Sequence, residues 1–274
     1  MAENIAATDL MEMILDGDNL NKAYLWVVSD KGAKDVDKME VKDLSSYFLT
    51  RKDELIGSIR DGSYRPKPAR GVEKPKGQGG GVGRYGGLPI VVDRLVQQAV
   101  AQVLAPLWED GLFSDHGYGF RPNRDLEMAV RKAKEYYDDG YNHVINIDLA
   151  KEFDIPNQAR LIHMMRDVVK DERVIKLIGL FLNSGVLKDG LISATAEGVP
   201  KGAPLAPLLS DIYLTKFDKQ LEAKGLKFVR SADDYKIFVR SKRAAERVME
   251  TSTRFLTDKL KLKVNQDKSQ VVSP

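Results

Sequence analysis

The chain has 274 residues, no cysteine and a formal net charge of +3, and 43% of its residues are hydrophobic while 30% are charged. This length supports one large domain or two subdomains with a real core, and the absence of cysteine excludes disulfides and thiolate metal sites. No apolar run approaches eighteen residues and no signal pattern opens the chain, so we expect a cytoplasmic protein without a membrane segment. Its histidines are scattered, which gives zinc little support.

Basic residues gather in two segments although the net charge is small. Residues 60–84 hold seven lysines and arginines against two acids, and four lysines stand between residues 259 and 268. Such stripes suit a polyanion, while the alternative is an ordinary solvated surface. Prolines and glycines within the first segment favour a shaped binding surface.

Helical and extended patterns alternate in the first half of the chain. A helix is predicted over residues 19–25 behind a cap at Asp18 or Asn19. Four prolines and many glycines within residues 61–90 predict extended segments at 64–68 and 72–75, followed by a glycine-rich hairpin tip at 77–83. Apolar residues at helical spacing between Val92 and Leu107 predict the next helix.

The second half predicts a sheet with helices packed on one of its faces. Helices are expected over residues 125–139, 157–184, 208–217 and 243–259, with a short hairpin at 188–190. Strands are expected at 144–149, on both sides of a turn within 228–239, and at 262–264. This order of elements predicts an α+β fold.

Three aspartates occupy strand ends in this scheme. Asp148 closes the first apolar strand, and Asp233 and Asp234 form the turn within residues 228–239. A hairpin beside a neighbouring strand can bring such carboxylates close enough to raise each other's pKa, so divalent cations between them would stabilise the arrangement. Two metals about 4 Å apart are the general apparatus of phosphoryl transfer. The alternative is that these are ordinary turn acids, because Asp is common at turns.

Ordered blocks of the sequence, from about residue 19 to residue 274, resemble the reverse transcriptases of bacterial group II introns. Tyr-Gly-Phe-Arg-Pro-Asn-Arg at residues 118–124 is especially specific, and Ala-Asp-Asp follows at residues 232–234. The other blocks are residues 31–37, 64–66, 84–98, 114–117, 147–154, 200–207 and 262–269.

The resemblance implies an α+β right-hand polymerase with fingers and palm, in which helices pack an antiparallel palm sheet. Residues 1–60 would be an N-terminal helical extension and the start of the fingers, 61–140 the fingers, and 141–274 the palm with some fingers elements inserted. The thumb, the RNA-binding region and the endonuclease would be absent. A portion without its thumb would hold a duplex poorly and expose apolar surface, so we expect self-association as a homodimer.

The resemblance also implies the chemistry of the site. Asp148, Asp233 and Asp234 would be the catalytic carboxylates that hold two Mg²⁺ ions, or Mn²⁺ in vitro, and the carbonyl of Leu149 would assist them. One ion would lower the pKa of the primer 3′-hydroxyl and the other would neutralise the triphosphate. Phe153 would exclude a ribose 2′-hydroxyl and so favour deoxynucleotides.

Basic side chains would hold the substrates. Their expected partners are an RNA template, a DNA or RNA primer, group II intron RNA and deoxynucleoside triphosphates, without a membrane. Arg121 and Arg124 have a second interpretation, in which they lock the fingers to the palm. The residues expected at the nucleotide are Lys76, Arg84, Leu149, Phe153 and Lys201, and those expected at the nucleic acid are Arg65, Arg70, Arg121 and Arg124.

Several positions depart from the pattern of the family. Ser231 stands before Ala-Asp-Asp where the family has Tyr, and Lys201 replaces a Gln whose paired donor and acceptor a lysine cannot copy. Residues 150–152 also differ. These changes leave open a catalytically weakened or inactive RNA-binding module that keeps the fold. A two-metal nuclease is a third alternative, which the family blocks disfavour.

Overall fold

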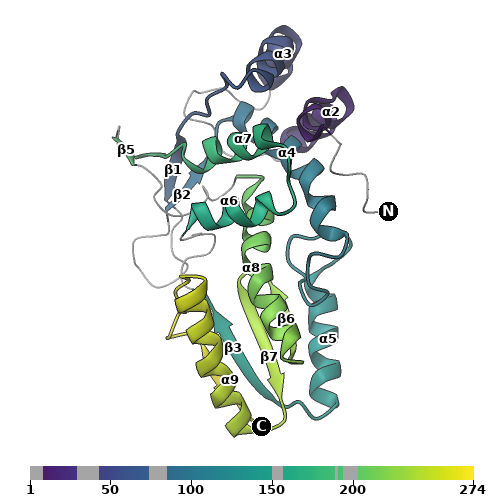
Figure 1. Ribbon diagram of the computed structural model, residues 1–274, viewed down its shortest axis with the longest axis vertical. Coiled ribbons are helices and arrows are strands. Elements are labelled where there is room, and N and C mark those ends of the chain that lie inside the picture. Colours follow the sequence, from purple (N-terminus) through teal and green to yellow (C-terminus); the bar gives the residue numbers. More distant parts are fainter. Residues whose placement is uncertain (1–8, 30–42, 74–84, 150–156, 189–190, 194–202) are drawn as a thin grey trace. The chain divides into compact units, whose positions relative to one another are not determined.

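The chain divides into two compact units that do not follow the order of the sequence. A computed structural model describes residues 9–29, 43–73, 85–149, 157–188, 191–193 and 203–274 (Figure 1). The first unit consists of Met1–Leu107 and Gln158–Ala206, and the second consists of Trp108–Asn157 and Pro207–Pro274.

The first unit combines helices with a small mixed sheet. The strands lie in the order β2-β1-β4-β5, in which β1 pairs antiparallel with β2 and parallel with β4. The β4–β5 pair is the short hairpin that the sequence predicted near residues 188–190. The elements are α1 (Leu10–Leu15), α2 (Gly17–Ser29), α3 (Leu44–Arg60), β1 (Ala69–Glu73), β2 (Tyr85–Leu88), α4 (Val91–Glu109, whose last residues belong to the second unit), α6 (Gln158–Arg166), α7 (Glu172–Leu182), β4 (Val186–Lys188) and β5 (Leu191–Ser193).

Apolar periodicity and local caps explain these helices. The stripe expected along α4 is confirmed, because Leu95, Ala99 and Val100 are fully buried. The prediction that Asp18 or Asn19 caps α2 is wrong. The helix begins at Gly17, and the carboxylate of Asp16 accepts the backbone N–H groups of Asp18 and Asn19 at 2.9 and 3.3 Å. A preceding acid therefore satisfies the free N–H groups of the first turn.

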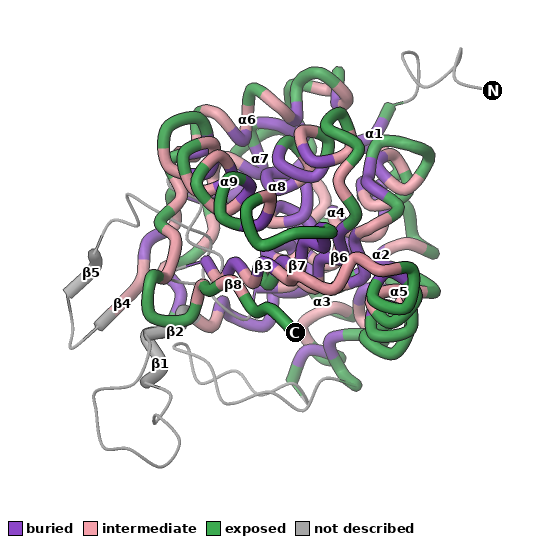
Figure 2. Tube along the Cα trace, turned by 90° about the horizontal axis from the view of Figure 1, so that it is seen from below, coloured by how far each residue is buried: buried purple, intermediate pink, exposed green. Residues whose placement is uncertain are grey.

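The second unit is built on a four-stranded antiparallel sheet with the strand order β6-β7-β3-β8. Figure 2 shows these four strands side by side. The elements are α5 (Leu126–Asp138), β3 (His143–Asp148), α8 (Ala206–Ala223), β6 (Lys227–Ser231), β7 (Asp234–Val239), α9 (Lys242–Arg254), a π-helical turn (Phe255–Lys259) and β8 (Gln270–Val272).

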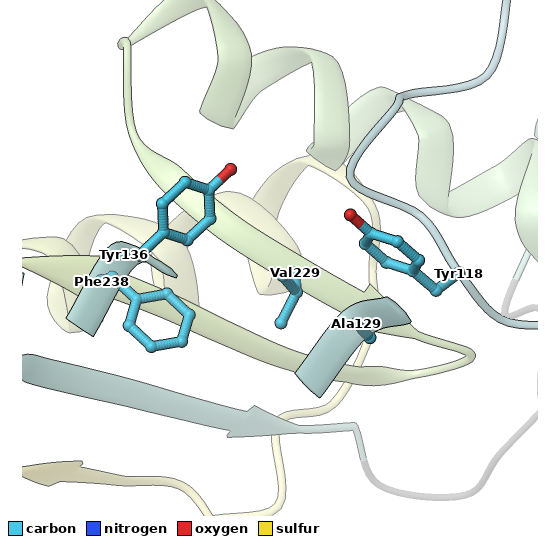
Figure 3. Packing of buried hydrophobic residues seen from close by; sticks show 5 residues of the cluster. All are labelled: Tyr118, Ala129, Tyr136, Val229 and Phe238. Carbon is cyan, nitrogen blue, oxygen red and sulfur yellow. The ribbon is translucent and has the colours of Figure 1, made fainter. Parts of the chain in front are cut away.

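Helices contact both faces of this sheet, so packing is not confined to one face as the sequence predicted, although α5 covers only the part of its face that carries Val229 and Phe238. On one face Ile147 of β3, Tyr235 of β7 and Arg230 of β6 are fully buried, and Phe217 of α8 contacts the ring of Tyr235. The other face carries an apolar cluster under α5. Figure 3 shows the residues of this cluster, which are Tyr118, Ala129, Tyr136, Val229 and Phe238.

The final strand also differs from the prediction. Residues 262–264 form only an isolated bridge between Val264 and Leu149. The strand that completes the sheet is β8, which pairs with β3 through partners such as Val271 and Ile145. Within the described residues, no helix has the length and apolar character needed to cross a membrane.

Candidate active site

Asp148 and Asp234 face each other across two adjacent strands. β3 ends at Asp148, β7 begins at Asp234, and the antiparallel register makes them direct partners. The Cβ atoms of such partners lie about 4.5–5.5 Å apart. Their side chains are 31% and 51% exposed, so both carboxylates reach solvent from the same face of the sheet. Like charges in this position destabilise a sheet unless other groups compensate them.

Lysine and asparagine side chains supply that compensation. Lys268 lies 3.6 Å from the carboxylate of Asp148, and Lys236 lies 3.3 Å from that of Asp234. The amide of Asn265 also donates to Asp148, at 3.0 Å. Within the described residues, no group of three or more acidic or histidine side chains is arranged as a metal site. As the side chains stand, the ammonium groups of Lys268 and Lys236 therefore offset the charge of the opposed carboxylates.

Asp233 belongs to a tight turn with an unusual backbone. Ser231 pairs with Asp234, so Ala232 and Asp233 form a two-residue hairpin loop. Ala232 has φ +55°, in the left-handed region. Glycine is the residue that such a position favours, and an alanine there costs on the order of 1–2 kcal/mol. Neighbouring groups must therefore hold the turn that presents Asp233.

The segment before α5 packs directly against this turn. Gly117 and Arg230 form a parallel bridge, in which Tyr118 N donates to Arg230 O and Arg230 N donates to His116 O, both at 2.8 Å. A Cβ atom on Gly119 would lie 2.4 Å from the backbone nitrogen of Ala232. Only glycine fits at that distance. The block at residues 118–124 thus shapes the hairpin that carries the acids.

The two arginines of this block occupy different environments. The side chain of Arg121 is 3% exposed, pairs with Glu109 at 2.7 Å and also donates to the carbonyls of Ser114 and Gly117. Arg124 is 22% exposed and pairs with Asp115 at 2.8 Å. The guanidinium of Arg121 is therefore held inside the second unit, whereas that of Arg124 reaches its surface.

The remaining predicted residues are distributed over both units. Arg65 and Arg70 are exposed in the first unit. The side chain of Leu149 is buried, and its backbone forms the bridge to Val264 in the second unit. The other four, which are Lys76, Arg84, Phe153 and Lys201, lie outside the described residues.

Sequence reasoning missed a buried ionic network beneath the turn. Arg230 is completely buried and pairs with Asp211 at 2.5 Å and Asp218 at 2.9 Å. The signal was available: the two acids stand seven residues apart in the apolar helix α8, and seven residues is close to two helical turns. Arg230, which lies inside the apolar strand β6, is the cation that pairs with both acids.

One protein family matches most of the chain. The family model described as reverse transcriptase (RNA-dependent DNA polymerase) matches residues 73–274. The chain belongs to the reverse transcriptase family. The resemblance to group II intron-encoded enzymes is thereby confirmed, together with the assignment to the RNA-directed DNA polymerases.

Relatives and solved structures agree with this assignment. Protein YkfC of Escherichia coli K12 is 30% identical over an alignment that covers 97% of this chain and 81% of YkfC. The group II intron-encoded protein LtrA of Lactococcus lactis is 32% identical over 83% of this chain, which spans only 37% of LtrA. Among solved structures, a chain of a partial Cas6-RT-Cas1–Cas2 complex matches with a TM-score of 0.55 and 21% identity. The match covers 92% of the present chain and 43% of the chain in that complex. The α+β polymerase fold is confirmed.

Proposed function

We propose that this reverse transcriptase extends a DNA or RNA primer on an RNA template, with Asp148, Asp233 and Asp234 as its catalytic carboxylates. The observation that carries the proposal is the direct pairing of Asp148 with Asp234, next to a turn that presents Asp233. Deoxynucleoside triphosphates are the proposed substrates, and Phe153 is the proposed selector against ribonucleotides.

The donor set suits two Mg²⁺ ions, with Mn²⁺ as a substitute in vitro. All three residues offer carboxylate oxygens, which Mg²⁺ prefers together with retained waters and substrate phosphates. When bound, the ions would lower the pKa of the primer 3′-hydroxyl and neutralise charge on the triphosphate. The carbonyl of Leu149 is a proposed additional ligand.

The protein's own groups keep the carboxylates in place. The hydroxyl of Ser269 accepts a hydrogen bond from the backbone N–H of Asp148 at 3.0 Å, and Asn265 N donates to Asp148 O at 2.8 Å. These bonds fix the end of β3. Lys268 and Lys236 neutralise the opposed carboxylates, which lowers the repulsion that the folded protein must sustain.

A primer-extension assay tests the proposal. The purified protein is given an RNA template, a labelled primer, deoxynucleotides and Mg²⁺, and we expect DNA synthesis that Asp148→Asn and Asp233→Asn each abolish. Asp267→Asn is the matched control, because Asp267 is an exposed aspartate on the segment that packs beside Asp148. Retained RNA binding by the inactive variants shows that they remain folded. Wild-type extension that survives Asp233→Asn would refute the assignment of the site.

We propose that the first unit is the fingers and the second the palm. This assignment would place residues 108–140 in the palm, because they belong to the unit that contains β3, β6 and β7. Arg65 and Arg70 are exposed on the first unit, which suits phosphate contacts to template or intron RNA. Replacing either by Gln should lower the salt dependence of RNA binding by about one unit of slope.

One observation favours a second function, a non-catalytic RNA-binding module. Lysines already compensate Asp148 and Asp234, and no three-residue metal cluster is present within the described residues. The same extension assay separates the two functions: unchanged RNA binding with no DNA product from the wild-type chain would select the module. The proposed homodimer is tested by gel filtration at two protein concentrations, where a monomeric mass at both would contradict it.

A further inference from the structure

Arg230 connects three parts of the second unit from a completely buried position. Its Nε and Nη2 donate to Asp218 at 2.9–3.1 Å, and its Nη1 donates to Asp211 at 2.5 Å. Nη1 also donates to the carbonyl of Ala232 at 3.0 Å. On the following strand, the hydroxyl of Tyr235 donates to Asp218 at 2.8 Å. The guanidinium therefore joins helix α8 to the turn that presents Asp233.

This network is a costly way to stabilise a core. Asp211 and Asp218 are 2% and 0% exposed, and Arg230 is 0% exposed. Burial opposes the charged arginine, but the carboxylates of Asp218 and Asp211 raise the pKa of its guanidinium well above the usual value. Burial also raises the pKa of Asp211. Well-packed apolar residues often replace a buried ionic group without loss of stability, so stability alone does not account for this one.

The geometry of the guanidinium matches a different task. Arginine has five N–H donors in a rigid plane, and in Arg230 they are directed at two carboxylates of α8 and one carbonyl of the turn. That carbonyl belongs to Ala232, whose φ of +55° an alanine does not favour. A lysine would carry the same charge without the planar fork.

We propose that Arg230, held by Asp211 and Asp218, is a positioning residue that fixes the Ala232–Asp233 turn for catalysis. The network clamps the turn on both sides, because Arg230 precedes it on β6 and Tyr235 follows it on β7. The role in catalysis rests on the proposed function of Asp233. The role in holding the turn does not, because it concerns the backbone of the hairpin itself.

Two variants of the network are compared with one buried control. Arg230→Lys keeps the charge and removes the fork, and Tyr235→Phe removes one donor to Asp218. The control is Tyr213→Phe, because Tyr213 is also a buried tyrosine of this unit and its hydroxyl donates to Leu260 O at 2.7 Å. Both changes remove the hydroxyl of a buried tyrosine together with the hydrogen bond that it donates, to Asp218 or to Leu260 O, and we expect similar decreases in melting temperature.

Two measurements distinguish positioning from general stabilisation. The first is hydrogen exchange of peptides covering residues 227–239, where we expect Arg230→Lys and Tyr235→Phe to accelerate exchange at the turn and Tyr213→Phe to leave it unchanged. The second is steady-state primer extension. There we expect Arg230→Lys to lower kcat by about tenfold to a hundredfold, the scale of a small misplacement of a catalytic group, with the KM for deoxynucleotides within about twofold of wild type.

Each outcome decides the proposal. The proposal is overturned if Tyr235→Phe and Tyr213→Phe lower the melting temperature equally and show equal hydrogen exchange at the turn. This holds even if Arg230→Lys does not fold. Equal kcat in wild type and in folded Arg230→Lys overturns the catalytic part. If the wild-type protein makes no DNA, the proposed function fails, and hydrogen exchange still tests whether Arg230 holds the turn.

Discussion

The contact between Gly119 and the acid-bearing turn predicts a large effect from the smallest substitution. In Gly119→Ala the new Cβ atom would lie 2.4 Å from Ala232 N, 3.1 Å from Ala232 Cα and 3.3 Å from Ser231 C. All three are backbone atoms, so no side chain can rotate away. Cβ contacts under 3.0 Å are essentially absent from proteins, and ordinary contact begins at 3.4 Å. The turn must therefore move by about 0.6–1.0 Å, the difference between these limits and 2.4 Å.

The expected magnitude follows from that displacement. Overpacking of this kind costs about 1–3 kcal/mol, which lowers the melting temperature by about 2–4 °C per kcal/mol for a domain of 150–250 residues. The effect on catalysis is larger, because a misplacement of about 1 Å can reduce a rate by about a hundredfold. We expect Gly119→Ala to be folded at 25 °C and to retain RNA binding, with a kcat for primer extension reduced by one to two orders of magnitude.

Gly179→Ala is the matched control. Gly179 lies within α7, and a Cβ added there meets no heavy atom within 4 Å. An alanine in that helix should be neutral or stabilise the protein by up to about 1 kcal/mol. Thermal unfolding and extension kinetics measured side by side check both variants. Wild-type kcat in Gly119→Ala would show that the close contact between the two backbones does not position Asp233.

Three further outcomes are expected at buried or proposed site residues. Arg121→Met should lower the free energy of unfolding in urea by about 3 kcal/mol, because it leaves the carboxylate of Glu109, which is 22% exposed, without its paired guanidinium. The same change should leave the salt dependence of RNA binding unchanged. Burial lowers the pKa of His116, so the unfolded chain binds its proton first as the pH falls. The free energy of unfolding should therefore decrease below about pH 6.5, and His116→Gln should flatten this dependence in denaturation curves at pH 5–8. Phe153→Ala should increase ribonucleotide incorporation in extension assays; equal discrimination by wild type and variant would remove Phe153 from the proposed role.

Strong local periodicity made most elements predictable. The helix expected between Val92 and Leu107 is α4, and the strand–turn–strand within residues 228–239 is β6 and β7. The final strand was predicted wrongly, because the apolar alternation at residues 262–264 is local whereas pairing with β3 is not. Lys261, just before that segment, has φ +58°. The chain therefore turns there, and it joins the sheet only at β8.

The positions of the acids could be predicted, but the contacts that hold them could not. Asp148 and Asp234 lie opposite each other because β3 ends at Asp148 and β7 begins at Asp234, and the antiparallel register of these two strands pairs those ends. Arg230 gave no such signal, because an arginine in a strand can equally face solvent. Its burial depends on α8, which reaches the sheet with Asp211 and Asp218 on one face. That contact is tertiary, and no local pattern contains it.

The same contacts bear on the departures from the family pattern. Gly119 and Arg230 hold the Ala232–Asp233 turn through backbone atoms and the buried guanidinium. Neither contact uses the side chain of Ser231, the residue that replaces the family's tyrosine. Its replacement therefore leaves both supports of the turn intact. Ser231 shares a half-exposed face with Asp234, on the side where substrate would bind. Its effect should therefore appear in the KM for nucleotide rather than in the kcat for synthesis.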